Sequence, residues 1–223
     1  MSESTEVVKA KGPVLPKPAP FALWRRILAF PFIKGVCWLT FKLFGRLRSV
    51  GGKRVPRKGG LLVFPNHRSD CDPPVIHAVS VRPMHFMAKS ELFEMPLTAW
   101  AMWLSEAFPV RRGEPDRAAL RHAAELAKLG EAVCVFPEGQ LSETGELQEI
   151  KPGVALIVRM AGVPCICLGL KNTEQVVPYG SLKPHFSKDR VEAVWGEPRT
   201  FDKSASAEEI TAWIDSELRR LSA

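Results

Sequence analysis

The chain has 223 residues, of which 46% are hydrophobic and 25% charged, so it can bury an ordinary core, and a disordered chain is excluded. Its formal charge of +7 and pI of about 9.3 favour anionic partners such as phosphates, nucleic acid or an acidic membrane surface, without choosing among them. An odd number of cysteines without a CxxC pair is typical of reduced, structural thiols in a cytoplasmic protein and argues against a zinc site.

The first fifty residues divide into an arm and a basic, aromatic segment. Residues 1–20 are polar and then proline-rich, which predicts a flexible arm. Residues 21–48 are rich in Phe, Trp, Leu and Ile, but six Lys and Arg residues interrupt them, so neither a membrane-spanning helix nor a cleaved signal peptide is expected. Pro31 is expected to divide this segment into a hairpin of two short helices.

Cations beside Trp and Phe, with no acid in the segment, suit a helical hairpin that lies in a membrane interface. The alternative is an ordinary hairpin packed on the domain, with Lys and Arg head groups reaching to water. Both descriptions can hold at once.

Strands and helices then alternate through residues 49–223, which we expect to form one domain. Buried or short strands are expected at 59–66, 84–88, 106–110, 131–136, 163–170 and 191–198. Helices are expected at 73–81, 95–105, 114–130, 152–162 and 206–221, the last with Ser204 or Ser206 as its N-cap. This alternation predicts an α/β fold with a mixed, largely parallel sheet flanked by helices. Ligands of such sheets gather at the carboxyl ends of the strands.

The first strand-end turn reads NHRSDCD and places His67 five residues before Asp72. On a continuous α-helix these side chains would point about 140° apart, but on a strand-to-helix turn they can meet. Pro73 disfavours helical geometry at Asp72, which favours such a turn. The Asp72 carboxylate can then accept the Nδ1–H of His67 and leave Nε2 free as a general base.

Three other interpretations of this turn stay open at the level of sequence. Asp72 can serve only as a helix N-cap, His67 only as a turn residue, and Asp70 can be the partner of the imidazole. A Ser or Cys nucleophile is disfavoured, because the chain has no Gly-x-Ser-x-Gly motif.

Two later turns also carry polar residues at strand ends. Arg111 and Arg112 follow a short strand and can grip a phosphate, although an arginine pair is often only a solvated surface feature. Glu138 and Gly139 follow the strand VCVFP, where the acid can orient an arginine or a substrate hydroxyl and the glycine permits close backbone approach. Lys151 precedes the next helix and is a further candidate to face an anion.

Together, the motifs NHRSDCD, FPVRRG, FPEG and VPCICLGL resemble, in order and approximate spacing, the four blocks of the 1-acylglycerol-3-phosphate (lysophosphatidic acid) acyltransferase family of glycerolipid acyltransferases. Arg112 occupies the family's arginine position, and the resemblance covers about residues 50 to 170. The chain departs from the family pattern at two places. After FPEG, where the family often has Thr-Arg-Ser, it has Gln140, Leu141 and Ser142. In the fourth block, Cys167 stands where a second proline is common. The missing arginine bears on which acceptor head group is bound more than on the type of reaction.

The resemblance implies transfer of a fatty acyl group from acyl-CoA or acyl carrier protein to a lysophospholipid hydroxyl, with His67 and Asp72 catalytic. Arg112, Arg111, Glu138, Gly139 and Lys151 would form the substrate site, without a metal or redox cofactor. It also implies work at an anionic membrane surface, as a peripheral or monotopic protein on the cytoplasmic face. A non-catalytic lipid- or phosphate-binding module is the rival interpretation, and a nucleic-acid binder is a more distant one, since no nucleic-acid motif is present.

Overall fold

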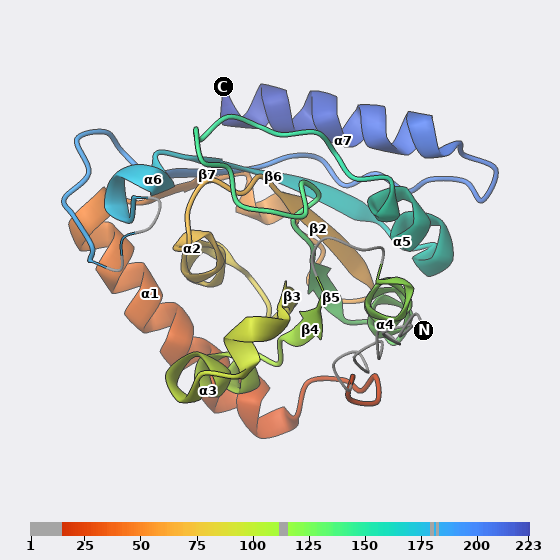
Figure 1. The fold of residues 1–223 in the computed structure, drawn as a ribbon, viewed down its shortest axis with the longest axis horizontal. Coiled ribbons are helices and arrows are strands. Elements are labelled where there is room, and N and C mark those ends of the chain that lie inside the picture. Colours follow the sequence, from red (N-terminus) through yellow and green to blue (C-terminus); the bar gives the residue numbers. More distant parts are fainter. Residues whose placement is uncertain (1–14, 112–115, 179–180, 182) are drawn as a thin grey trace, which may run out of the picture.

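The structure, a computed structural model, describes residues 15–111, 116–178, 181 and 183–223. Most of the arm expected at residues 1–20 lies outside these ranges, as does Arg112. The described residues form a seven-stranded sheet covered by helices on both faces (Figure 1). The strands are β1 (Arg48–Val50), β2 (Leu61–Pro65), β3 (His85–Lys89), β4 (Phe108–Val110), β5 (Ala132–Cys134), β6 (Cys165–Lys171) and β7 (Glu192–Trp195).

The strand order is β1-β7-β6-β2-β5-β3-β4, and every neighbouring pair is parallel except β6 and β7. The expected mixed, largely parallel sheet is therefore confirmed. β2 lies near the centre and is buried along its whole length, because helices cover both faces of the sheet. The turn after β2 thus starts from the best-packed part of the molecule.

The α-helices are α1 (Phe30–Gly45), α2 (Asp72–Val79), α3 (Pro96–Leu104), α4 (Arg117–Lys128), α5 (Gly153–Ala161), α6 (Thr173–Val176) and α7 (Ala207–Ser222). Shorter helical turns of other types are η1 (Arg25–Ala29), η2 (Gly52–Arg54) and η3 (Ser90–Phe93). α1 and α2 share one apolar core with Leu61 and Val63 of β2, whereas α4, α5 and α7 share the other with Leu62 and Phe64. This alternation follows from the two-residue repeat of a strand.

The expected elements are present within a few residues of their predicted bounds, and Ser206 is the N-cap of α7, accepting from the backbone N–H of Glu209 at 3.0 Å. Two elements were not expected, the strand β1 and the single-turn helix α6. β1 has the sequence RSV and α6 the sequence TEQV, so neither contains the apolar run that indicated the other short strands.

The N-terminal segment forms one helix of 21 residues from Arg25 to Gly45, so the predicted hairpin is wrong. Pro31 lies in the first turn of α1, directly after the π-helical turn η1, where the N–H of Phe30 donates to the carbonyl of Arg25 five residues back. A proline is tolerated in such a first turn, and the wider π-helical turn makes room for its ring. The helix therefore continues through the proline.

By length and composition alone, this helix is long and apolar enough to cross a membrane. The sequence had led us to expect no such helix, because charged residues interrupt the segment. Three of those charges turn toward the body of the protein. Arg25 pairs with Glu106 at 2.6 Å, Arg26 pairs with Glu131 at 2.8 Å, and Lys34 donates to the Ser80 carbonyl at 2.7 Å.

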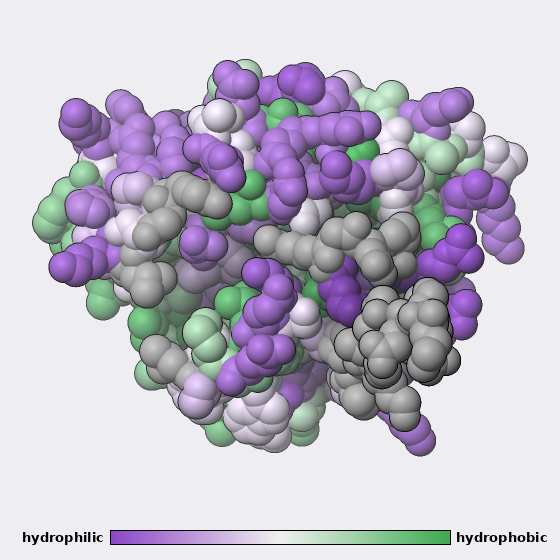
Figure 2. All heavy atoms as spheres, in the orientation of Figure 1, coloured by the Kyte–Doolittle hydropathy of each residue, from purple (hydrophilic) through white to green (hydrophobic). Residues whose placement is uncertain are grey.

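The outward face of the helix is consequently apolar. It exposes a row of large side chains: Leu23, Trp24, Ile27, Leu28, Phe32, Val36, Trp38, Leu39 and Leu43. Trp100 and Trp103 of α3 extend this face, and the rings of Trp24 and Trp103 lie 5.9 Å apart. We call these residues of α1 and α3, with the preceding Leu23, Trp24, Ile27 and Leu28, the apolar face. Green side chains follow the margin of the molecule where α1 and α3 lie (Figure 2).

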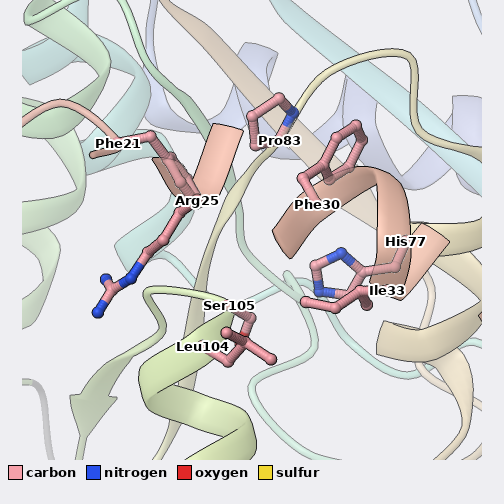
Figure 3. Close-up of a pocket in the computed structure, with 8 residues that line it drawn as sticks. All are labelled: Phe21, Arg25, Phe30, Ile33, His77, Pro83, Leu104 and Ser105. Carbon is pink, nitrogen blue, oxygen red and sulfur yellow. The ribbon is translucent and has the colours of Figure 1, made fainter. Parts of the chain in front are cut away.

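The inner side of the same helix packs around a narrow pocket bounded by α2 and α3 (Figure 3). The pocket holds only about 10 Å³, roughly one water molecule, and His77 lines it from the C-terminal end of α2. Burial lowers the pKa of His77 to about 4, so this imidazole is neutral near pH 7. The pocket belongs to the packing of the helix and is too small for an acyl chain.

Candidate active site

The turn after β2 is fastened to the neighbouring strand by Asn66. Its amide Nδ2 donates to the carbonyl of Leu170 at 3.0 Å, and its Oδ1 accepts the N–H of Leu170 at 2.6 Å. The side chain thus extends the parallel pairing of β2 and β6 by one position. This fixes where the chain leaves the sheet and where His67 begins.

The His67–Asp72 contact expected from the sequence is present. His67 Nδ1 lies 2.9 Å from Asp72 Oδ2, and the two side chains are 7% and 0% exposed. The same oxygen accepts the backbone N–H groups of Arg68 at 2.6 Å and Ser69 at 2.9 Å. An ionised Asp72 accepts at this oxygen and requires Nδ1 to carry the proton, which leaves Nε2 as the acceptor atom of the ring.

These contacts decide between the alternatives that the sequence left open. Asp72 is the first residue of α2, but its carboxylate reaches back to residues 67–69, so it is not only a helix cap. Asp70 is exposed and does not contact the imidazole. Pro73 and Pro74 follow inside the first turn of the helix, where their missing N–H groups leave no intrahelical bond unmade.

The FPEG turn holds His67 from the other side. The ring of Phe136 stacks on the imidazole with centroids 3.9 Å apart and planes 21° from parallel. Glu138 Oε1 accepts the backbone N–H of His67 at 2.7 Å, and Ser142 donates its N–H to the His67 carbonyl at 2.9 Å. Both backbone polar groups of His67 are therefore bonded to the segment that follows β5.

Glu138 has a contact different from the one expected of it. It is 1% exposed, and its second oxygen, Oε2, accepts the N–H of Gln148 at 2.8 Å. Burial raises the pKa of Glu138, an effect opposed by the two backbone N–H donors. Both oxygens are thus occupied by main-chain donors, which points to a positioning role in place of the predicted direct contact with an arginine or substrate hydroxyl.

Gly139 and Lys151 meet at the same turn. Gly139 has a φ of +72°, a conformation that favours glycine, and its N–H closes the turn on the carbonyl of Phe136. A Cβ at Gly139 would lie 3.4 Å from Cγ of Lys151, whose own N–H donates to the Pro137 carbonyl. The exposed Lys151 therefore lies against the FPEG turn, although 12 residues separate it from Gly139.

Arg111 lies at the end of β4, with Asp116 beside it. Asp116 accepts the Arg111 N–H at 3.2 Å through one oxygen and caps α4 through the other, which accepts from Ala119 at 3.1 Å. The Arg111 side chain is 46% exposed, and its Nε lies 3.8 Å from Asp116 Oδ2, a long ion pair that leaves the rest of the guanidinium group without an acid among the residues that the structure describes. The structure thus presents Arg111 to solvent at a strand end, and the prediction for Arg112 lies outside the described residues.

The neighbouring Ser69 and Cys71 are not placed as nucleophiles. Ser69 is fully buried and donates its hydroxyl to the Val177 carbonyl at 2.6 Å. Burial, which is the largest cause, and the adjacent Asp72 raise the pKa of Cys71 to about 12, so this thiol is not ionised near pH 7. Within the described ranges, no group of three or more His, Cys, Asp or Glu side chains is arranged to hold a metal ion.

An open cleft of about 490 Å³ lies beside the turn, between Arg68, residues 145–147 and the end of α7. Arg68 pairs with Glu174 at 3.3 Å, and Arg219, on the far wall, pairs with Asp215 at 2.8 Å. The two arginines of the cleft are therefore already matched by acids, and we assign it no anion.

Comparison with known proteins gives this arrangement its context. A family model described as Acyltransferase matches residues 46–171, more than half of the chain and all four motifs. The chain belongs to the acyltransferase family. The crystal structure of the 1-acyl-sn-glycerophosphate (LPA) acyltransferase PlsC from Thermotoga maritima is similar to it, with a TM-score of 0.71 and 25% identity over 86% of this chain and 77% of that one.

Curated 1-acyl-sn-glycerol-3-phosphate acyltransferases are also similar in sequence. A chloroplastic protein of Brassica napus is 29% identical over 162 residues, which are 71% of this chain and 43% of that protein. The protein of Bacillus subtilis is 26% identical over 171 residues, 76% of this chain and 81% of the relative. The chain thus spans less than half of the plant relative but most of the bacterial one.

Sequence reasoning missed the residues that hold His67 and its turn in place. Asn66, Phe136 and Ser142 had no assigned role, yet each fixes His67 or the turn that carries it. Their position inside or next to the NHx4D and FPEG motifs was the available signal. Nothing in the spacing indicates which groups they contact.

Proposed function

We propose that this acyltransferase moves a fatty acyl group from a thioester, acyl-CoA or acyl carrier protein, to the hydroxyl of a lysophospholipid, with 1-acylglycerol-3-phosphate as the acceptor and phosphatidic acid as the product. Residues 49–223 form the acyltransferase domain, and residues 21–48 contact the membrane. The observation that carries the proposal is the 2.9 Å contact between His67 Nδ1 and Asp72 Oδ2, since a protein that only binds lipid needs no oriented base.

The chemistry follows from the free ring nitrogen. Nε2 of His67 takes the proton of the acceptor hydroxyl as its oxygen attacks the thioester carbonyl, and Asp72 stabilises the resulting imidazolium. When the tetrahedral intermediate collapses, the carbon–sulfur bond breaks and the imidazolium returns its proton to the leaving thiolate. The alcohol itself is the nucleophile, so no acyl-enzyme forms, which agrees with the buried hydroxyl of Ser69 and the raised pKa of Cys71.

The acceptor phosphate binds to cations at the neighbouring strand ends. Arg112 takes this role by its place in the second motif, with Arg111 beside it. Lys151, which lies against Gly139, supplies a cation at the FPEG turn, where this chain has Leu141 in place of an arginine. Glu138 shapes the site by holding the His67 backbone.

The protein works as a monotopic protein on the cytoplasmic face of a membrane. The apolar face supplies the contact, while the ion pairs of Arg25 and Arg26 hold the other side of the helix against the domain, so lipid does not surround it. All five cysteines are free, which agrees with a reducing compartment where acyl-CoA and acyl carrier protein occur.

The test is thiol release from acyl-CoA that depends on added 1-acylglycerol-3-phosphate. His67→Ala is expected to abolish this release with an unchanged circular dichroism spectrum, and Asp72→Asn to lower kcat by about a hundredfold or more. The control is Asp70→Asn, which alters an exposed carboxylate two residues away and is expected to keep the wild-type rate. Wild-type turnover in His67→Ala would exclude the mechanism, and lysolipid binding without thiol release in the wild type would favour a binding module.

A further inference from the structure

The loop of residues 183–190 lies beyond the family match, which ends at residue 171, and none of the site residues lies on it. It follows α6 and runs beside the C-terminal end of α1, on the left of the view in Figure 1. Its sequence is KPHFSKDR, with one aromatic residue among three cations and one acid. All of these residues except Ser187 are exposed.

Phe186, in the middle of this loop, is 70% exposed and is not an isolated surface side chain. Its ring stacks on Phe44 of α1, with centroids 4.7 Å apart and planes 29° from parallel. Leu43, the preceding residue of α1, is 61% exposed and belongs to the apolar face. Phe186 is therefore an exposed aromatic side chain fixed at the C-terminal end of α1, whereas α3 lies beside the N-terminal end of that helix.

The loop is held in place by backbone and amide contacts. Ser187 donates its N–H to the Phe44 carbonyl at 2.9 Å, and Gln175 of α6 both accepts the N–H of Asp189 and donates to its carboxylate. Arg46 donates to the Lys188 carbonyl. Phe186 is thus displayed on a fixed scaffold, so its insertion into a bilayer requires little further ordering of the chain.

The charge around Phe186 is positive. Lys183 and Lys188 flank it in the sequence; both are exposed, and within the described parts of the chain no ion pair joins either of them to an acid. The one acid of the loop, Asp189, has its carboxylate engaged by the Gln175 amide at 2.9 Å. An exposed aromatic side chain with an exposed lysine on either side of it in the sequence complements a bilayer surface that carries anionic head groups.

We propose that residues 183–190 form a second membrane anchor that binds anionic lipids, with Phe186 entering the interface and Lys183 and Lys188 contacting the head groups. This anchor rests on the proposed membrane function and adds to it a second contact site, which recognises the anionic head groups. Because α3 lies beside the N-terminal end of the helix and the loop packs on its C-terminal end, membrane contacts at both places would fix the long axis of α1 along the bilayer surface. Purple side chains gather beside green ones along this margin of the molecule (Figure 2).

The test is flotation of the full chain with vesicles of phosphatidylcholine alone and of phosphatidylcholine mixed with phosphatidylglycerol. The variant Lys183→Gln/Lys188→Gln is expected to lose affinity for the anionic vesicles by about fivefold per charge at low salt, and to bind neutral vesicles as the wild type does. Phe186→Ser is expected to weaken binding to both vesicle types by about fivefold or more.

Matched controls are Lys128→Gln/Lys203→Gln and Leu129→Ser, which change exposed residues outside the loop and the apolar face. Wild-type binding of the lysine variant to anionic vesicles would overturn the anchor, as would an equal loss in the control. Retention on duplex DNA that depends on these lysines, without a vesicle effect, would assign the loop to nucleic acid instead. Acyl transfer to an acceptor dispersed in detergent is expected to be unchanged in the loop variants, so the anchor and the catalytic proposal fail separately.

Discussion

His67 is constrained at four places, and this constraint is what separates it from an ordinary turn histidine. Asp72 holds Nδ1, Phe136 covers one ring face, and Glu138 and Ser142 bind the N–H and carbonyl of its backbone. A general base must lie within hydrogen-bond reach of the proton it removes, so small displacements of the ring lower the rate. Backbone positioning by Glu138 is therefore expected to matter for turnover.

Replacing Glu138 with Gln tests that positioning. Glutamine offers one oxygen where two backbone N–H groups now donate, so one buried donor loses its acceptor and the free energy of unfolding falls by about 1–3 kcal/mol. We expect kcat to fall while KM for the acceptor changes little, measured by thiol release alongside urea unfolding. Glu149→Gln, at an exposed position, is the control. A raised KM with unchanged kcat and stability would instead make Glu138 a substrate contact.

For single residues, the sequence indicated the His67–Asp72 pair but not the residues that hold this pair in place. The spacing allowed either Asp70 or Asp72 to face His67, and only the folded turn decides between them, because both lie within a few residues of the ring. The main-chain acceptor roles of Glu138 could not be predicted, since they depend on how residues 139–148 return to the turn.

Among the elements, α1 departs furthest from what the sequence predicts. A proline and six cations suggested two short interfacial helices, yet a π-helical turn accommodates Pro31 and tertiary contacts hold Arg25, Arg26 and Lys34 on the inner side. Hydrophobic period predicts elements with buried apolar residues, which is why six of the seven strands and the longer helices that cover the sheet were correctly expected. It does not reveal which cations of a basic helix find partners far away in the chain.

His77 reports on the packing of α1 against α2. Its pKa is lowered by burial from 6.5 to about 4, so the folded state binds fewer protons than the unfolded state between these values. The contribution of His77 to stability is present above pH 6.5 and is lost as the pH falls toward 4. Relative to His77→Leu, the wild type is expected to lose about 1.4 kcal/mol of unfolding free energy per pH unit in this window.

Urea unfolding of both proteins at several pH values measures this difference. The plots of unfolding free energy against pH for the two proteins are expected to run parallel above pH 6.5, where the imidazole is neutral in the folded and the unfolded state. This pH range is the internal control. Parallel curves down to pH 4 would mean that α1 does not bury His77 in solution.

For the molecule as a whole, the apolar face on α1 and α3 and the site at the carboxyl end of β2 belong to one packed body, because α1 and α2 share a core with β2. When α1 docks on the bilayer, the position of His67 relative to the bilayer is therefore fixed as well. The double change Phe32→Ser/Leu39→Ser removes two side chains that are 68% and 63% exposed. We expect it to weaken vesicle binding by at least about tenfold per side chain.

Acyl transfer to an acceptor embedded in vesicles is expected to fall in parallel with the binding of this variant, whereas transfer to a detergent-dispersed acceptor stays at the wild-type rate, because no catalytic group is touched. Flotation and thiol release on the two acceptor preparations measure these quantities. The matched control is Leu129→Ser/Leu156→Ser, which changes exposed leucines directly after α4 and on α5. If the vesicle-embedded acceptor is used at the wild-type rate despite lost flotation, docking and catalysis are independent, and the face does not serve to bring His67 to its substrate.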